Sequence, residues 1–170
     1  METGETSQAC GQTEPRAEHR WPQRLVGEWT FEGEAAMAPG TAPERFLGAE
    51  RGRPIGGLWI QAEGQGEMPG GGAATTLTTL GYDPRRKRYV GTFIASMMTH
   101  LWIYDGALDA AARILTLDAE GPDMAVEGKL DKYQDVTELK SDNHRLLTSR
   151  VLSAGGTWAT IMTAHYRRRV

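Results

Sequence analysis

The stretch that decides the fold is KRYVGTFIASMMTHLWIYDGAL, residues 87–108. It is rich in β-branched and aromatic residues, which favour strands. Two apolar segments flank a Met-Met-Thr-His corner at residues 97–100, so the stretch predicts two antiparallel strands joined by a short turn. The corner places the polarisable pair Met97 and Met98 and the titratable His100 beside aromatic residues. We therefore expect this hairpin to line any pocket of the protein.

Strand-like segments continue on both sides of the hairpin. From Leu25 to Ala35, an apolar or small face alternates with a largely acidic face, which is the period of a half-buried strand. A charged segment at residues 44–53 is expected to form a peripheral strand. The further segments of strand composition are residues 58–68, 73–83, 114–121, 129–139, 144–153 and 157–168. The one helix we expect is a short N-terminal plug around Trp21 and Pro22.

Roughly ten short strands, about 8 to 14 residues apart and joined by turns, predict an all-β protein. Short connections favour pairing of sequential neighbours, and closure removes exposed strand edges. We predict a single up-and-down antiparallel β-barrel of about 8–10 strands, wide enough for side chains or one small ligand. Residues 1–18 are polar and predict a disordered tail, which leaves 19–170 as the single barrel domain.

Composition limits the partners and the compartment. The 170 residues include 19 Lys and Arg against 22 Asp and Glu, a net charge of -3, so no nucleic-acid partner is expected. Cys10 is the one cysteine, which excludes an internal disulfide framework and suits a reducing compartment. No apolar run approaches the ~20 residues of a membrane helix, and the start lacks a secretory pattern. We expect a cytoplasmic protein with no membrane partner, and a homodimer remains open.

The opening segment Leu25-Val26-Gly27-Glu28-Trp29 resembles the first strand of lipocalin-like, or calycin, barrels. In those barrels a Gly-x-Trp closes the barrel base, and a cationic side chain near the end of the last strand packs over the Trp. Arg167 and Arg168 are the candidates here. A guanidinium over an indole contributes about 0.5–2 kcal/mol. The resemblance therefore implies a barrel-closing role for Trp29, Arg167 and Arg168.

Five segments carry a more specific resemblance that extends from about Leu25 to Arg168. They are GEWTFEGEAAMAPG (27–40), LGYDPRRKRYVGTFIASMMTHLWIYDGALD (80–109), ILTLDAEGP (114–122), KYQDVTEL (132–139) and WATIMTAHYRR (158–168). Together they are similar to the bacterial proteins grouped as domain of unknown function 1579. Members of that family resemble lipocalin-like barrels and have no established biochemical function. The resemblance implies the fold and transfers no active site.

Gly27, Trp29 and Gly33 also match a Gly-x-Trp-x-Gly-x-Gly pattern, with Phe31 at the middle Gly position. That pattern resembles the first strand of the nitrobindins, which are haem-binding barrels. Nitrobindins ligate haem through a His near the C-terminus, where this chain has His165. A Phe at position 31 would fill space that a porphyrin needs. We expect no cofactor; if haem were bound, His165 would be its ligand.

Other reactive side chains predict no metal site and identify no catalytic residue. The chain has no His-x-His or His-x-x-x-His spacing, so no metal is expected. His19 and His144 lie in polar stretches and are expected to be exposed.

Carboxylates are plentiful, for example Asp118 and Asp135, and most alternate with apolar residues, as outward positions on a barrel do. One of them could act as a general base if it were buried. In the segment at residues 129–139, Asp135 shares a face with Tyr133, Thr137 and Leu139.

Methionine and aromatic side chains often line adaptable apolar pockets. We predict a lumen site formed by Phe93, Met97, Met98, His100, Trp102, Tyr104 and Met162. The leading interpretation is a barrel that binds an apolar or amphipathic small molecule in this lumen. Two alternatives stay open: a lumen-based enzyme such as a cyclase or isomerase that uses His100, Tyr104 or a buried acid, and a structural or interaction protein with a filled barrel.

Overall fold

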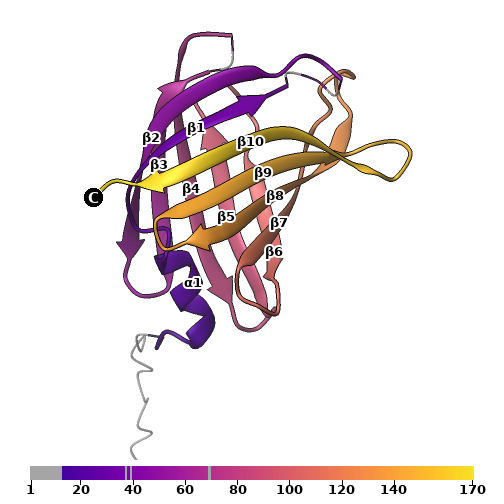
Figure 1. Cartoon of the computed structure of the whole chain (residues 1–170). Coiled ribbons are helices and arrows are strands. Elements are labelled where there is room, and N and C mark those ends of the chain that lie inside the picture. The colour runs from indigo at the N-terminus through magenta and orange to yellow at the C-terminus, as the bar shows by residue number, and fades with distance from the viewer. Residues whose placement is uncertain (1–12, 37, 39, 69) are drawn as a thin grey trace, which may run out of the picture.

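The computed structural model describes residues 13–36, 38, 40–68 and 70–170. A 3₁₀ helix, η1 (Ala17–His19), and a one-turn helix, α1 (Arg20–Gln23), precede ten strands (Figure 1). The strands are β1 (Gly27–Ala35), β2 (Glu44–Ile55), β3 (Trp59–Glu67), β4 (Ala73–Asp83), β5 (Arg88–Ala95), β6 (Trp102–Leu108), β7 (Ile114–Pro122), β8 (Leu130–Ser141), β9 (His144–Leu152) and β10 (Trp158–Arg168). Among the helices that the structure describes, none has the length and apolar character to cross a membrane.

The sheet is a closed antiparallel barrel. Each strand pairs with its sequence neighbours, and β1 also pairs with β10, which closes the ring. This topology confirms the predicted up-and-down barrel. The charged segment at residues 44–53 lies in β2, which pairs with both β1 and β3, so the expectation of a peripheral strand is wrong. Once the barrel closes, no strand is left at an edge.

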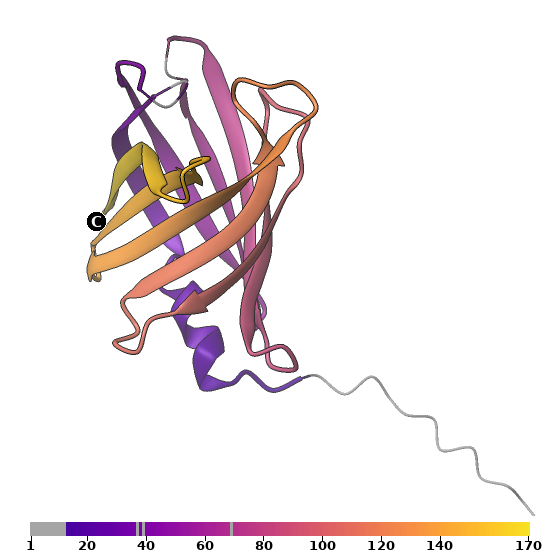
Figure 2. The same cartoon turned by 90° about the vertical axis from the view of Figure 1, so that its right-hand side faces the viewer.

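The alternating strand directions give the barrel two different ends. The β1–β2, β3–β4, β5–β6, β7–β8 and β9–β10 connections share one end, which we call the mouth. The other four connections and α1 lie at the opposite end, the base (Figures 1 and 2). The N-terminal helices therefore obstruct one end of the barrel and leave the mouth to the loops.

The predicted helical plug is confirmed, and Trp21 anchors it. Its side chain is buried, and its indole Nε1–H donates a 3.1 Å hydrogen bond to the carbonyl oxygen of Ala112 in the β6–β7 turn. The Tyr89 hydroxyl on β5 donates a 3.2 Å hydrogen bond to the carbonyl of Glu18. These two bonds join the plug to strands from the middle of the chain and hold it across the base.

The plug begins earlier in the chain than its sequence indicates. η1 starts at Ala17, inside the segment 1–18 that the sequence assigns to a tail, and residues 1–12 lie outside the described residues. His19 is only 3% exposed, so the expectation that it faces solvent is wrong. Its ring lies edge-on to Tyr82, with 5.7 Å between centroids, and its Nδ1 accepts a 2.9 Å hydrogen bond from the Arg16 backbone N–H. The short helical turn places this polar ring inside the base.

Apolar side chains fill the half of the barrel next to the plug. Ile60, Leu80 and Leu115 point inward from three different strands and are at most 1% exposed. They pack in a cluster with Trp21, Leu25, Ala62, Tyr89, Tyr104, Leu117, Ala119 and Leu139. Burial of a large aliphatic side chain stabilises a fold by about 1.5–3 kcal/mol. This cluster is the main hydrophobic core of the barrel and fills the part of the lumen next to the plug.

A β-bulge in β10 decides which of its side chains face inward. The pairing of β10 with β9 shifts between Thr160 and Met162. A bulge inserts one unpaired residue and so changes the phase of alternation. Met162 pairs with Ser149 on the inner face, whereas Trp158 lies under the guanidinium of Arg150 on the outer face. Strict alternation predicts one shared face for Trp158 and Met162, and the bulge makes that prediction wrong.

Candidate functional site

Directly paired residues of antiparallel strands point to the same side of the sheet, so the register identifies the side chains that face the lumen. Near the mouth, several of these inward side chains are half-buried, whereas Ala95, Tyr133 and Val151 at the same end are buried, like the cluster at the base. The half-buried ones form a set of their own. We call this set the upper lumen. It consists of Phe31, Phe46, Thr76, Thr78, Phe93, Trp102, Leu147, Ser149 and Met162.

Two phenylalanine rings of the upper lumen lie against glycines of the neighbouring strand. A Cβ atom on Gly33 would stand 2.7 Å from Cζ of Phe46, and one on Gly48 would clash with the ring of Phe31. Both positions require glycine, because a side chain at either one would displace the phenylalanine ring that packs against it. The two rings therefore lie along the barrel wall, and Phe31 also packs against Tyr166 with 5.1 Å between centroids.

A buried ion pair lies between the upper lumen and the base. Arg145 on β9 donates a hydrogen bond from Nη2 to Oε1 of Glu50 on β2, and the two side chains are only 6% and 12% exposed. The Arg145 guanidinium also lies 4.6 Å from the ring centre of Trp29 and 4.3 Å from that of Tyr166. Two aromatic faces and one carboxylate thus compensate the desolvation of this cation.

A second polar group lies at the same level and centres on Asp135. Its Oδ2 accepts a hydrogen bond from the Tyr104 hydroxyl, and its Oδ1 accepts one from the Ser149 hydroxyl. Burial raises the pKa of Asp135, although the two hydroxyl donors act in the opposite direction. The pKa of Tyr104 is raised well above its usual value, first by burial and then by the neighbouring Asp135 carboxylate.

Asp135 faces the lumen and is an exception to the expectation that most carboxylates point outward. It pairs with Leu117 on one side and with Ser149 on the other, on the inner face of both strands. The signal that identifies this orientation is its spacing from Tyr133 and Leu139, which are both buried. Together, the two groups form what we call the polar layer, which consists of Glu50, Tyr104, Asp135, Arg145 and Tyr166, together with Ser149, which also belongs to the upper lumen.

The residues predicted for the ligand site divide into two groups. Phe93, Trp102, Tyr104 and Met162 face the lumen. Met97 and Met98, in the β5–β6 turn at the rim of the mouth, are 46% and 42% exposed. His100 is half-buried beside this turn. The structure therefore brings four of the predicted side chains into the lumen and leaves three on its rim.

The rim residues contact the lumen through Trp102. Its indole Nε1–H donates a hydrogen bond to Met98 Sδ at 3.2 Å. The ring of His100 lies edge-on to Trp102, with 5.0 Å between centroids, and His100 Nε2 is 2.9 Å from the carbonyl oxygen of Glu120. Trp102 in turn packs edge-on against Tyr133, with 4.9 Å between centroids. The rim thus continues the aromatic wall of the lumen outward to the mouth.

Trp29 contacts two guanidinium groups. It is 1% exposed, and its Nε1–H donates a 3.0 Å hydrogen bond to the Leu25 carbonyl. The guanidinium of Arg168 is 4.2 Å from its ring centre, on the same ring system that Arg145 contacts. Arg168 is held by a 2.6 Å hydrogen bond from Nη1 to the carbonyl of Val26. Arg168 is therefore the predicted barrel-closing cation that contacts Trp29.

The other candidates at the end of the chain lie on the outer face. Arg167 is exposed and pairs with Thr30, away from the Trp29 ring. His165 is also exposed, and its Nδ1 lies 3.0 Å from Nε2 of His144, which is half-buried. Within the described part of the chain, no group of three or more His, Cys, Asp or Glu side chains could hold a metal ion.

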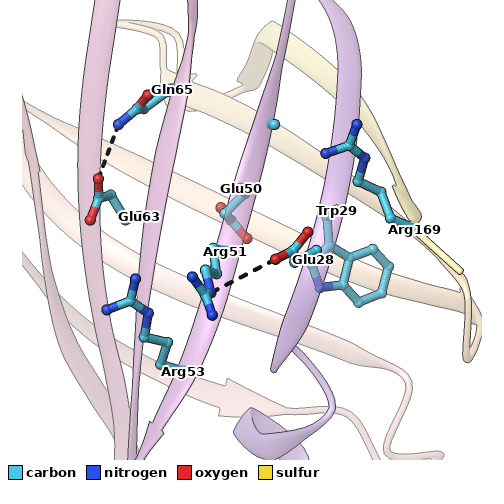
Figure 3. Close-up of a pocket in the computed structure, with 9 residues that line it drawn as sticks. Glu28, Trp29, Glu50, Arg51, Arg53, Glu63, Gln65 and Arg169 are labelled. Carbon is cyan, nitrogen blue, oxygen red and sulfur yellow. Dashed lines mark hydrogen bonds and ion pairs between the residues drawn. The ribbon is translucent and has the colours of Figure 1, made fainter.

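Two shallow hollows lie over β1 and β2. The first, of about 250 Å³, is lined largely by charged side chains: Glu28, Trp29, Ala49, Glu50, Arg51, Arg53, Glu63, Gln65 and Arg169 (Figure 3). The second, of about 330 Å³, is lined by Thr30, Phe31, Glu32, Leu47, Gly48, His165 and Arg167. The pocket expected from residues 93–104 and Met162 is neither of these hollows.

The first hollow is lined by charges of both signs. Arg51 Nε lies 3.9 Å from Glu28 Oε1, and Gln65 Nε2 donates a 3.1 Å hydrogen bond to Glu63 Oε1 (Figure 3). Exposed pairs of this kind contribute about 0–1 kcal/mol. Because three carboxylates and three guanidinium groups line it, this hollow offers no concentrated field of one sign to a ligand.

These features define a class: a closed ten-stranded antiparallel β-barrel of the lipocalin-like kind, plugged at one end by a short N-terminal helix. The chain belongs to the family described as "Protein of unknown function (DUF1579)", whose family model matches residues 14–168. The resemblance noted in the sequence is thereby confirmed. No curated protein matches the chain.

Solved structures with similar folds include natural and designed barrels. The S-type phycobiliprotein lyase CPES from Guillardia theta superposes with a TM-score of 0.61 at 11% identity. The match covers 92% of this chain and 99% of that chain. The designed barrel EF1p2_mFAP2b bound to DFHBI gives a TM-score of 0.49 at 13% identity, covering 90% of this chain and 100% of that one. At such low identity, the likeness shows the fold alone.

Proposed function

We propose that this protein binds a small amphipathic molecule in the upper lumen. The observation that carries the proposal is that several large apolar side chains near the mouth face inward and stay accessible. Ile60 and Leu80 at the base are 0% and 1% exposed, whereas Phe93 and Met162 near the mouth point inward and are still half-buried. Apolar side chains that face inward but stay accessible offer a surface that a ligand can cover.

The chemistry of the lumen favours a ligand with one apolar and one polar end. Phenyl rings, an indole and a thioether surround the space near the mouth, and Met side chains adapt readily to irregular ligands. Below them, the polar layer offers carboxylate, hydroxyl and guanidinium groups. A ligand that enters from the mouth would place its apolar body along the aromatic wall and its polar end on this layer.

A second candidate function, an enzyme of the same fold, is favoured by the bond between Tyr104 and Asp135. Burial raises the pKa of Asp135, and a carboxyl with a raised pKa can take part in general acid–base catalysis. In that case, the ligand would be converted rather than released unchanged. Mass spectrometry of the ligand before and after incubation with the protein separates the two functions.

The direct test is native mass spectrometry of protein purified from its own host, in which a bound molecule adds a defined mass. A complementary assay uses the uncharged probe Nile red, whose emission rises in an apolar site. The matched variants are Thr76→Trp, which fills the lumen, and Thr75→Trp, which adds the same ring on the exposed outer face.

We expect Nile red emission with the wild-type protein and with Thr75→Trp, and its loss with Thr76→Trp. Emission that survives in Thr76→Trp would place the probe outside the lumen. Together with the absence of any added mass, that result would overturn the proposal.

A further inference from the structure

We propose that Asp135 recognises a protonated nitrogen, so that the ligand of the lumen is a cationic amphiphile. This inference rests on the proposed function, since it assigns the polar end of the molecule that the upper lumen would hold. It goes further by naming the residue that selects that end and the charge that it selects.

The geometry prepares the Asp135 carboxylate as an acceptor. Each of its two oxygens accepts one hydroxyl hydrogen bond, from Tyr104 and Ser149 respectively. A carboxylate offers about four lone-pair sites, so each oxygen keeps capacity for a further donor. The side chain is half-buried and lies on the inner face, paired with Ser149 of the upper lumen. Its two partners fix its orientation, and its free lone pairs suit a donor that comes from the mouth.

The charges of the polar layer leave Asp135 without a cation. Arg145 and Glu50 neutralise each other in their own ion pair. Among the salt bridges formed by residues that the structure describes, none includes Asp135. An ionised Asp135 therefore gives the layer an excess of one negative charge. An uncompensated carboxylate in such surroundings is costly, and a bound cation would remove that cost.

Amine, alcohol and carboxylate head groups differ in the hydrogen-bond donors and the charge that they supply to Asp135. A protonated amine supplies both a donor and a compensating charge, and a hydrogen bond between two ionised groups is stronger than a neutral one. An alcohol supplies a donor without charge. A carboxylate head group supplies neither and would be repelled by Asp135. The raised pKa of Asp135 is consistent with a site that lacks its counter-ion when empty.

The test measures displacement of Nile red by decylamine, decanol and decanoate, which share one chain length, each below its micelle-forming concentration. We expect decylamine to bind the wild-type protein about tenfold to hundredfold more tightly than decanol, as a hydrogen bond to a charged group implies. In Asp135→Asn this preference should disappear while decanol binds as before. Asp118→Asn, the same change on the outer face, should keep the preference.

A second readout needs no variant. In the wild-type protein, the carboxyl ¹³C resonance of Asp135 should titrate at lower pH when decylamine is bound, and decanol should leave its midpoint unchanged. If decanol or decanoate binds as tightly as decylamine, or if the Asp135 midpoint does not move, the inference is wrong and lumen binding stands. If none of the three displaces Nile red and the probe itself stays dark, the proposed function fails first.

Discussion

Arg145 and Glu50 form an ion pair across the inside of the barrel, although they lie 95 positions apart in the chain. Their strands, β9 and β2, are not neighbours in the sheet, since β10 and β1 lie between them. The pair therefore joins two strands that share no backbone pairing, across the two strands that lie between them. Because both side chains are nearly inaccessible to solvent, each charge depends on the other for compensation.

We predict that Arg145→Met destabilises the protein by about 3–5 kcal/mol, because it leaves the Glu50 carboxylate buried without a partner. The double variant Glu50→Gln with Arg145→Met should recover a large part of that loss, since no buried charge remains. Urea unfolding of the wild type, of the single variants Arg145→Met and Glu50→Gln, and of the double variant gives the coupling free energy. Strictly additive effects would show that the two side chains do not compensate each other.

The two cation–π contacts of Trp29 lead to a prediction about the base. Trp29→Ala should cost about 3–5 kcal/mol, as expected for removal of a fully buried large side chain. Trp59→Ala is the matched control, because the Trp59 side chain is 39% exposed; its cost should be about 1 kcal/mol. Equal shifts of the unfolding midpoint in the two variants would contradict a special role for Trp29.

The pKa of Asp135 predicts a pH dependence of stability. Its folded-state pKa is raised above the unfolded value, which is about 3.9. The folded state then binds the proton more tightly, so this group lowers stability as pH rises above the unfolded pKa. Asp135→Asn should therefore have a higher free energy of unfolding than the wild type between about pH 4 and pH 7. The difference should begin at about pH 4, where the carboxyl of the unfolded state ionises. The outer-face variant Asp118→Asn should show no comparable gain.

The barrel can be predicted from the sequence because apolar and polar residues alternate clearly along its strands. In β1, Trp29 and Phe31 fall on one face and the acidic residues on the other, and the structure keeps that division. The N-terminal plug is predicted for a different reason: Trp21 is apolar, and Pro22 is tolerated at the start of a helix. Alternation does not predict which residues face inward beyond a β-bulge, because the bulge shifts the pattern by one residue. The bulge at residues 160–162 changes the face of Trp158 relative to Met162 without any mark in the composition.

The polar layer is harder to predict because it reverses the usual preference of charged side chains for the outer face. A pattern that assigns acids and arginines to solvent places Glu50, Asp135 and Arg145 on the wrong side. Each is stable inside only because of a partner from a distant segment: Arg145 for Glu50, and Tyr104 and Ser149 for Asp135. Such partners become neighbours only when the barrel closes, and one sequence does not show that register.

The last prediction concerns haem. An axial ligand must face a dry pocket with open space on the far side of the iron. His165 instead lies exposed on the outer face, paired with Glu32 across β1 and in contact with His144. Phe31 points into the lumen against Tyr166. We therefore predict that protein mixed with haemin gives no sharp Soret band and that His165→Ala leaves the spectrum unchanged. A sharp band that disappears in His165→Ala would show that the strand turns this ring inward and binds haem, and His144→Ala would then report whether the outer histidine contact opposes that turn.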